Sequence, residues 1–307
     1  MYFLLREAHI QMNNIYTASY NNNVAVPDVI SKGRAYAMPL IFIRTVQPQD
    51  CISAALWSDN MIIQSYENSP RADACIKYLR GVEDVRRYEN IVLLPIPTTR
   101  DGKTILNTKI DIDGLIDGFD ANTLVSGYGV PSGFLEKSRK KGAVVIDLSC
   151  DEDFLLENAE LTALAALGIY LTSTKRSVRD TSVGIVGYGR IGKKLTNLFL
   201  YLGASVRVFT SREGTRLDLC EWGVTTEKSS KDADLLGLDL LINTAPASIF
   251  DKEIIPAGLR IIDLASGDNF QGVPSVEKYP SIPAKMFPES AGRVWGRAIE
   301  RYLTNNL

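Results

Sequence analysis

The chain has 307 residues, of which 45% are hydrophobic and 23% charged, and its formal net charge is −2. This length accommodates two domains of ordinary size. The charge gives no basic surface for nucleic acid, and no apolar run approaches the ~18 residues of a membrane span. Four widely spaced cysteines and a single histidine disfavour a structural zinc site. We expect a globular cytoplasmic protein with reduced thiols and with no metal, nucleic-acid or membrane partner.

Residues 1–60 contain strand-like runs at 24–26 and 40–46 but no clear order. From residue 61 onward, apolar runs alternate with helical patterns, which is typical of a parallel sheet covered by helices on both faces. The strands are predicted at 61–66, 90–97, 122–127 and 143–148, and the helices between them at 72–80, 111–117 and 131–140.

Polar residues follow the predicted strand 90–97 at its carboxyl end. Thr98, Thr99 and Arg100 offer hydroxyls and a guanidinium, and arginine can hold a carboxylate through two parallel hydrogen bonds. Thr99 and Arg100 are therefore candidate contacts for a carboxylate ligand. A solvated loop without a ligand remains the alternative.

A long helix rich in alanine and leucine is predicted at 155–174, and the domain boundary is placed in it. Glu160 lies near the start of this otherwise apolar helix. It is a candidate to orient a ligand or, if buried, to carry a proton. A carboxylate that simply suits the positive end of the helix dipole is an equal alternative.

The pattern after this helix is strand, glycine turn, helix and strand, which is the unit that binds the pyrophosphate of a dinucleotide. The apolar run 183–186 leads into Gly187, Gly189 and Gly192. The first glycine permits a tight turn, the second lets backbone N–H groups approach phosphate, and the third lets helix and strand pack closely. Arg190 and Ile191 begin the helix whose unpaired N–H groups face the anion.

The end of the second strand, predicted at 205–210, bears on the choice of cofactor. An NAD site usually places a carboxylate there, whereas this chain has Thr210, Ser211 and Arg212. Hydroxyls and a guanidinium suit the 2′-phosphate of NADP, so NADP is favoured. The neighbouring Glu213 keeps NAD as an alternative.

Two later strand ends complete the predicted cofactor site. Thr244, Ala245 and Pro246 follow the strand 238–243 and are expected beside the ribose or nicotinamide, although an ordinary strand-end turn has the same pattern. Ser266 follows the strand 259–264 and is assigned to the same site.

These elements predict an α/β fold of two doubly wound parallel-sheet lobes, the C-terminal one a Rossmann domain. A final strand is expected at 282–286, and an amphipathic helix at 290–303 is expected to pack back toward the first lobe. The predicted divisions are a substrate lobe at 1–154, the NAD(P)-binding domain at 155–287 and the returning helix at 288–307.

This plan resembles the D-2-hydroxyacid dehydrogenase superfamily, and several motifs are similar to the family of the A-type subunit of dipicolinate synthase within it. The motifs are Leu94–Asp101, Asn158–Glu160, Gly187–Gly192, Ile242–Pro246, Ile262–Ser266 and Pro288–Gly292. The resemblance implies the dehydrogenase-like half of an enzyme that oxidises dihydrodipicolinate to dipicolinate during sporulation. It also implies a small dicarboxylate substrate, an oligomer, and a partner that is a flavoprotein-like second subunit.

Three features depart from the patterns of these families. The first 60 residues lack a glycine-rich strand turn, no arginine stands at the end of the strand 259–264, where Ser266 is found, and no histidine follows His9. D-2-hydroxyacid dehydrogenases use a late histidine as general base, so ordinary hydroxyacid oxidation is disfavoured, whereas aromatising a dihydropyridine needs a less demanding base. A non-catalytic NAD(P)-binding sensor or scaffold, and a reductase of another 2-oxo acid, remain open.

Overall fold

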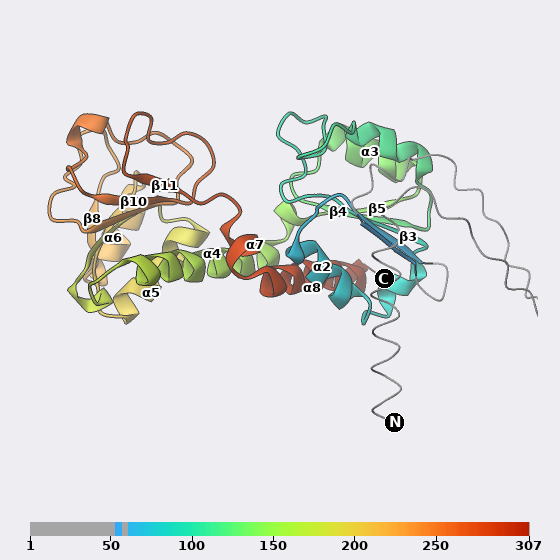
Figure 1. Cartoon of the computed structure of the whole chain (residues 1–307), viewed down its shortest axis with the longest axis horizontal. Coiled ribbons are helices and arrows are strands. Elements are labelled where there is room, and N and C mark those ends of the chain that lie inside the picture. Colours follow the sequence, from blue (N-terminus) through green and yellow to red (C-terminus); the bar gives the residue numbers. More distant parts are fainter. Residues whose placement is uncertain (1–52, 57–60, 307) are drawn as a thin grey trace, which may run out of the picture. The chain divides into compact units, whose positions relative to one another are not determined.

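The computed structural model describes residues 53–56 and 61–306, in which two sheets carry helices on their faces (Figure 1). The predicted runs at 24–26 and 40–46 therefore lie outside the described residues. We call the five-stranded sheet and its helices the first lobe, and the six-stranded sheet and its helices the second lobe. The predicted α/β fold class is confirmed.

The first sheet has the strand order β1-β2-β3-β4-β5, with β1 antiparallel to β2 and the remaining pairs parallel. Its strands are β1 (Ser53–Leu56), β2 (Ile62–Ser65), β3 (Asn90–Leu93), β4 (Thr123–Gly127) and β5 (Val144–Asp147). The connecting helices are α2 (Pro70–Leu79), η1 (Asp84–Arg87), η2 (Ile112–Gly118), α3 (Ser132–Lys140) and η3 (Leu148–Cys150). Helix α2 covers one face of this sheet, and η2 and α3 cover the other.

The second sheet is entirely parallel, with the order β11-β10-β9-β6-β7-β8. Its strands are β6 (Ser182–Val186), β7 (Ser205–Phe209), β8 (Thr225–Glu227), β9 (Leu240–Asn243), β10 (Arg260–Asp263) and β11 (Val276–Lys278). Its helical segments are η4 (Val178–Asp180), α5 (Arg190–Tyr201), α6 (Glu213–Glu221) and η5 (Lys252–Ile254). The chain moves outward from β6 to β8 and then returns to β9 on the other side of β6. Ligands of such sheets bind at the carboxyl ends of the strands, where this reversal occurs.

One predicted strand is wrong. Residues 282–286 form α7 (Ile282–Met286), with proline at its start, and the last strand is β11. Proline fixes a φ that suits the first turn of a helix. Strand β11 is half-exposed and contains Glu277 and Lys278, so it lacks the apolar run that marks the other strands.

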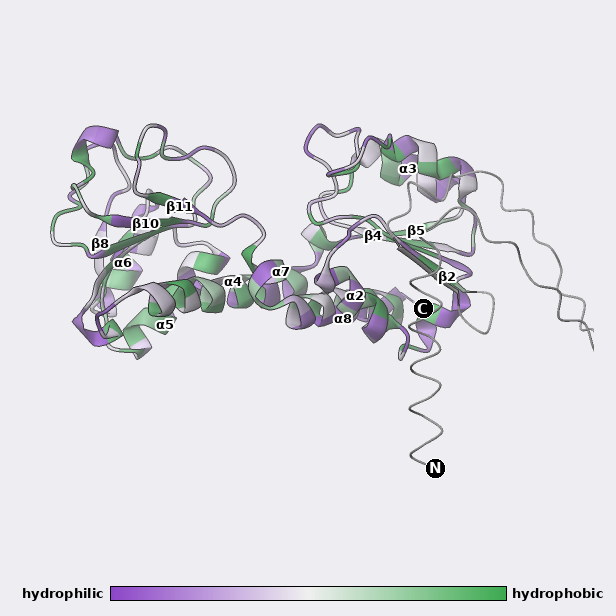
Figure 2. Cartoon of the chain, in the orientation of Figure 1, coloured by the Kyte–Doolittle hydropathy of each residue, from purple (hydrophilic) through white to green (hydrophobic). Residues whose placement is uncertain are grey.

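The helix predicted at 155–174 is α4 (Glu152–Ser173), which begins earlier because Asp151 caps it by accepting from the backbone N–H of Phe154 at 3.0 Å. By length and composition alone, α4 is apolar enough to cross a membrane (Figure 2). This is weak evidence, because 44% of its most apolar window is buried inside the protein and core helices pass the same test. Its buried residues include four alanines, Ala159, Ala163, Ala165 and Ala166.

The last helix, α8 (Pro288–Asn306), packs against α2 and contributes Val294, Trp295 and Ile299 to the core of the first lobe. Close approach of the two helices depends on glycine. A Cβ atom at Gly292 would lie 2.4 Å from the carbonyl oxygen of Arg71. Residues near the end of the chain therefore complete a core built mainly from residues 61–154.

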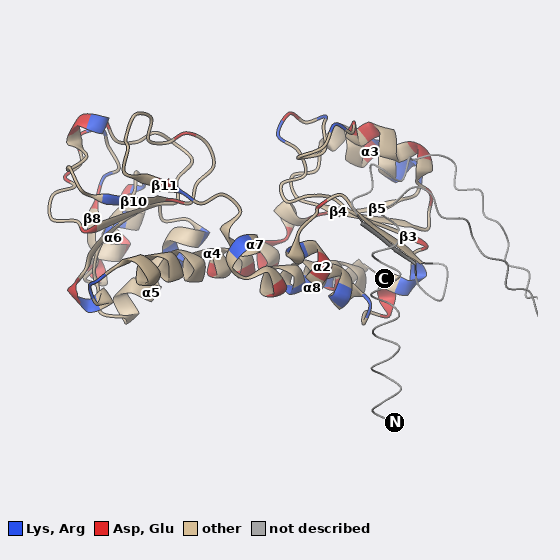
Figure 3. Cartoon of the chain, viewed as in Figure 1, with Lys and Arg blue, Asp and Glu red and all other residues tan. Residues whose placement is uncertain are grey.

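Charged residues are spread over the helices and loops of both lobes, and the strands carry few of them (Figure 3). No described element gathers the basic residues into a continuous stripe. This distribution agrees with the formal net charge of −2.

Candidate functional site

The glycine turn after β6 is built as the sequence predicts. Gly187 has φ +88°, a left-handed conformation that L side chains rarely adopt. A Cβ atom on Gly187 would lie 2.8 Å from the hydroxyl oxygen of Thr244. This first glycine is therefore required both by the turn and by the neighbouring strand end.

The other two glycines differ sharply in their surroundings. A Cβ atom at Gly192 would lie 2.1 Å from the carbonyl oxygen of Gly187, so α5 packs directly against the turn. A Cβ atom at Gly189 would meet nothing within 4 Å. Packing within the protein thus explains Gly192 but not Gly189, whose missing side chain leaves the backbone open to a ligand.

The first turn of α5 offers backbone N–H groups at the end of the glycine turn. Gly189 is its N-cap and no side chain caps it, so the first N–H groups, from Arg190 onward, have no side-chain acceptor. Ile191 is half-buried in the same turn. These residues fit a pyrophosphate, which helix N-termini bind through bare amides and the helix dipole.

The Arg190 side chain has a protein partner. Its Nε and Nη2 donate to the two carboxylate oxygens of Glu152 at 2.9 and 2.6 Å. The hydrogen bond from Arg190 is the main reason that the pKa of Glu152 is lowered. Both side chains are about half exposed, so the pair is accessible to a competing anion.

The end of β7 presents Arg212, a cation without an acidic partner among the described residues. Thr210 is buried and its hydroxyl accepts from the backbone N–H of Arg212 at 3.3 Å. Ser211 and Arg212 are exposed, and neither side chain forms a hydrogen bond or ion pair with another described residue. Arg216, one turn into α6, donates to the carbonyl oxygen of Thr210 at 2.9 Å and so fixes the strand end.

At the end of β9, the Thr244 side chain forms a hydrogen bond to the backbone just before the glycine turn. Its hydroxyl donates to the carbonyl oxygen of Val186 at 2.8 Å, beneath Gly187. Ala245 is half-buried, and Pro246 and Ser266 are exposed. The structure brings these strand ends to the same edge of the sheet as the glycine turn.

A buried polar network holds the β9 and β10 ends together. Asn243 donates to Asp263 at 2.8 Å, and Asn269 donates to the same carboxylate at 3.2 Å. Asn243 also accepts from the N–H of Ala245, and Asn269 donates to the carbonyl oxygen of Ser266. Asp263 is only 1% exposed and has amide donors as partners. It therefore links two loops that carry predicted cofactor contacts.

In the first lobe, the residues after β3 divide into a buried and an exposed group. Thr98 is fully buried and its hydroxyl accepts from the N–H of Tyr128 at 2.9 Å, which is a structural role. Thr99 donates to Asp101, whose pKa is lowered chiefly by hydrogen bonds from the backbone N–H groups of Thr104 and Lys103. Arg100 is exposed and has no partner among the described residues.

Glu160 does not have the surroundings that a buried proton carrier needs. It lies two turns into α4, its side chain is 58% exposed, and it forms an ion pair with Lys194 at 2.8 Å. The sequence prediction placed Glu160 near the start of its helix, whereas α4 begins at Glu152, and Lys194 of α5 pairs with the Glu160 carboxylate. Its predicted catalytic role has no support from this geometry.

The sequence reasoning missed three groups: Asp263 with its two asparagines, Glu152, and the buried pair Glu67 and Arg71. Only the first had a visible signal, since the apolar strands β9 and β10 both end in a polar residue. Within residues 61–306, no group of three histidine, cysteine or acidic side chains is placed to hold a metal ion.

No protein-family model matches the chain. The A-type subunit of dipicolinate synthase from Bacillus subtilis is 22% identical to it over 231 residues, which cover 69% of this chain and 77% of that protein. The similarity predicted from the motifs is therefore confirmed.

Two further comparisons agree with this fold. The crystal structure of the A-type subunit of dipicolinate synthase from Bacillus halodurans superimposes with a TM-score of 0.58 and 23% identity, and covers 69% of this chain and 79% of that chain. D-lactate dehydrogenase of Staphylococcus aureus is 25% identical over 130 residues, which are 41% of this chain and 36% of that enzyme. The chain thus has the fold of the dipicolinate synthase subunit. Dehydrogenases are among its relatives in sequence.

Proposed function

We propose that this protein binds a nicotinamide dinucleotide at the carboxyl ends of β6, β7, β9 and β10 and acts as an oxidoreductase. The observation that carries the proposal is the contrast within the glycine turn. Gly187 and Gly192 are required by packing, whereas Gly189 borders open space beside the uncapped start of α5. Hydride transfer would be the chemistry that the bound nicotinamide supplies.

We further propose NADP as the preferred cofactor. The support is the exposed guanidinium of Arg212, which has no partner within the part of the chain that the structure describes, and the neighbouring residue Ser211, which offers a hydroxyl. No carboxylate occupies positions 210–212, so nothing there would repel a 2′-phosphate. Glu213 follows at the start of α6, which keeps NAD as the competing cofactor.

The proposed substrate is dihydrodipicolinate or a similar small cyclic dicarboxylate. This rests on the similarity to the dipicolinate synthase protein of Bacillus subtilis and on Arg100, whose exposed guanidinium has no partner in residues 61–306 and suits a carboxylate. That relative is named as one subunit of its enzyme. We therefore propose with it an oligomeric assembly and a second subunit, which is flavoprotein-like as the family implies.

The decisive experiment is a turnover assay with dihydrodipicolinate and either NADP or NAD, with and without a flavoprotein-like partner. We expect a saturable change in reduced-nicotinamide absorbance that requires the cyclic dicarboxylate. A chain 2-oxo acid that turns over when the cyclic compound does not would replace the synthase with a reductase of that acid.

A non-catalytic NAD(P)-binding sensor is the second candidate. The chain has no histidine after position 9, and the loop after β10 carries Ser266 and not an arginine. Tight nucleotide binding without turnover of any cyclic or chain acid would establish this candidate and reject the oxidoreductase.

Cofactor choice gives the first mutational prediction. Arg212→Glu is expected to weaken NADPH binding at least tenfold and to leave NADH binding within a few fold, because only NADPH carries the 2′-phosphate. Titration of nucleotide fluorescence would measure both. Lys252→Glu makes the same charge change at an exposed site of the second lobe and should alter neither. Equal loss of both nucleotides in Arg212→Glu would reject the assignment.

A further inference from the structure

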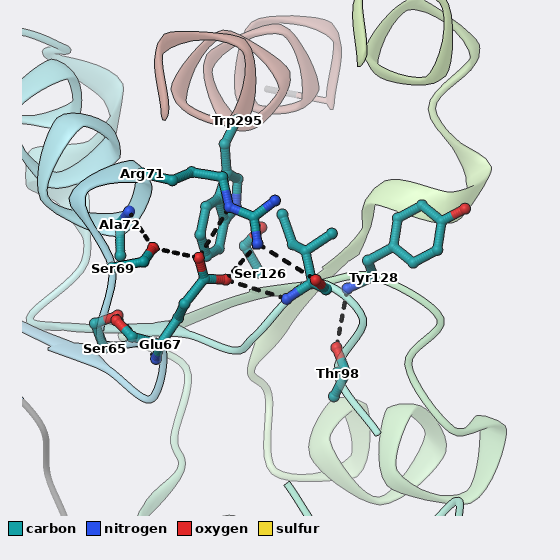
Figure 4. A network of polar contacts seen from close by, with 10 residues as sticks. Ser65, Glu67, Ser69, Arg71, Ala72, Thr98, Ser126, Tyr128 and Trp295 are labelled. Carbon is teal, nitrogen blue, oxygen red and sulfur yellow. Dashed lines mark hydrogen bonds and ion pairs between the residues drawn. The ribbon is translucent and has the colours of Figure 1, made fainter. Parts of the chain in front are cut away.

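A buried ion pair lies between β2 and α2 in the first lobe. The guanidinium of Arg71 donates to both oxygens of the Glu67 carboxylate, at 2.9 and 2.7 Å (Figure 4). The side chains are only 7% and 11% exposed. Taking two charges out of water is costly, and a buried pair is often no more stabilising than apolar residues of the same size. The pair therefore needs an explanation beyond stability.

The two charged groups hold one residue of the next strand end. Glu67 accepts from the backbone N–H of Ile96 at 3.2 Å, and Arg71 donates to the carbonyl oxygen of Ile96 at 3.3 Å. Both polar backbone groups of Ile96 are thus held by one ion pair. Ile96 lies beyond the end of β3, where the sheet no longer supplies backbone partners.

The carboxylate of Glu67 has no spare capacity for proton transfer. Besides Arg71 and Ile96, it accepts from the hydroxyl of Ser69, which caps α2. Four donors therefore occupy its two oxygens. The geometry thus indicates a fixed anchor.

The anchored loop is connected onward to its neighbours. The N–H of Thr98 donates to the carbonyl oxygen of Tyr128, and the hydroxyl of Thr98 accepts from the N–H of Tyr128, both at 2.9 Å. Asp147, at the end of β5, accepts from the N–H groups of Gly129 and Val130 at 2.9 and 3.1 Å. The carboxyl ends of four neighbouring strands are therefore tied in series, starting from the ion pair.

Helix α8 closes the network from the other side. The Arg71 guanidinium lies 5.9 Å from the ring centroid of Trp295, and the Trp295 indole N–H donates to the Ser126 hydroxyl at 2.9 Å. The indole thereby shields the pair from water and contacts β4. Exclusion of water strengthens the hydrogen bonds that the pair makes to Ile96.

We propose that Glu67 and Arg71 are positioning residues that fix the loop 94–101, and with it Arg100, before a dicarboxylate binds. This inference rests on the proposed function, in which Arg100 meets the substrate. Arg100 is four residues beyond Ile96. If Ile96 is not anchored, the loop becomes more mobile and the position of the Arg100 guanidinium varies more. Preorganisation of this kind lowers the entropy lost on binding.

The test compares charge removal with charge balance in the full-length protein. Glu67→Gln and Arg71→Met each leave one buried charge without its ion-pair partner and are expected to lower stability. The double variant Glu67→Leu/Arg71→Met removes both charges and fills the site, so stability should recover toward wild type. Neither apolar side chain can hold the backbone of Ile96.

In the double variant we expect the KM for dihydrodipicolinate, and the Kd for pyridine-2,6-dicarboxylate as a probe, to rise at least tenfold. The Kd for NADPH, bound in the second lobe, should stay within twofold. Hydrogen exchange at the Thr98 amide, which the ion pair does not touch, should accelerate at least tenfold. Wild-type values for dicarboxylate binding and Thr98 exchange would overturn the proposal.

Two provisions keep the outcome decisive. If the double variant does not fold, Arg71→Lys is measured in the same way, since lysine keeps the charge but cannot reach Glu67 and Ile96 together in the fork geometry. If the wild-type protein itself binds no dicarboxylate, the proposed function fails. Exchange at Thr98 then still decides whether the pair fixes the loop.

Discussion

Gly189 and Gly192 lie three residues apart in the same turn, but their surroundings differ. Gly192 is confined by the carbonyl oxygen of Gly187, at 2.1 Å from where a Cβ would stand, and Gly189 is confined by nothing within 4 Å. Gly192 is therefore required for folding, whereas we assign the absence of a side chain at Gly189 to the proposed nucleotide. A matched pair of substitutions separates the two.

Gly192→Ala is expected to destabilise the protein by roughly 1–3 kcal/mol or more, because the added methyl group overlaps backbone. Gly189→Ala has a φ of −83° at its site and open space around the new methyl, so stability should stay within about 0.5 kcal/mol. Its NADPH affinity should nevertheless fall at least tenfold. Thermal unfolding and NADPH titration measure the two effects. Full affinity in Gly189→Ala would place the nucleotide elsewhere.

Cysteine reactivity gives a second prediction at this scale. Cys75 is fully buried, and burial is the main reason that the pKa of its thiol is raised. Cys150 and Cys220 are exposed. Iodoacetamide should therefore alkylate the exposed Cys150 and Cys220, whereas Cys75, which is buried and keeps its proton, should stay unmodified.

Mass spectrometry of the alkylated peptides at pH 7 and 9 would test this. Above the pKa of an unfolded, solvated thiol, the native state keeps the Cys75 proton and the unfolded state loses it. Cys75 therefore lowers the free energy of unfolding as the pH rises through this range. Alkylation of Cys75 at the rate of Cys150 in native protein would contradict its burial.

Among the elements, the contact between α2 and α8 depends on two glycines of α8. A Cβ at Gly292 would lie 2.4 Å from the backbone of Arg71, and one at Gly296 would lie 2.4 Å from the ring of Tyr78. Gly292 meets backbone, which cannot turn away as a side chain can. The backbone that it meets belongs to the arginine of the positioning pair.

Gly292→Ala should therefore destabilise the protein by roughly 1–3 kcal/mol, because α8 must move away from α2. The matched control is Gly133→Ala in α3, where a Cβ meets nothing within 4 Å and a helix gains from alanine by up to about 1 kcal/mol. Urea unfolding followed by circular dichroism would compare them. Equal stability of both variants would mean that the two helices are further apart than described.

In the molecule as a whole, the end of the chain returns to its first lobe. Trp295 and its α8 neighbours complete the core of that lobe, whereas the two hydrophobic clusters of the second lobe contain no residue of α8. The second lobe and the core of the first lobe thus depend on α8 to different degrees.

A chain ending at Phe287 should consequently lose the cooperative structure of the first lobe but keep NADPH affinity within a few fold. Limited proteolysis, which cuts unfolded segments, and nucleotide titration would show the difference. The milder change Trp295→Phe removes the hydrogen bond to Ser126 and part of a fully buried ring, and should cost roughly 1–3 kcal/mol. Protease resistance of residues 61–151 in the shortened chain would contradict this role of α8.

Short stretches of sequence were enough to predict the α/β class, most strand positions and the glycine turn, because each is encoded in a few neighbouring residues. Strands appear as apolar runs, and a turn that needs positive φ appears as Gly187. The same reasoning could not find β11, whose polar side chains hide the strand. Nor could it find the exposure of Glu160, which depends on where α4 begins and on Lys194.

Which polar side chains meet was settled by tertiary packing alone. Asp263 is joined to Asn243, twenty positions away, and Trp295 to Ser126, 169 positions away. Such contacts leave no periodic mark in the chain, since each partner alone is an ordinary asparagine, aspartate or tryptophan. Their positions follow from the packing of strands and helices, which fixes long-range neighbours only after the local elements have formed.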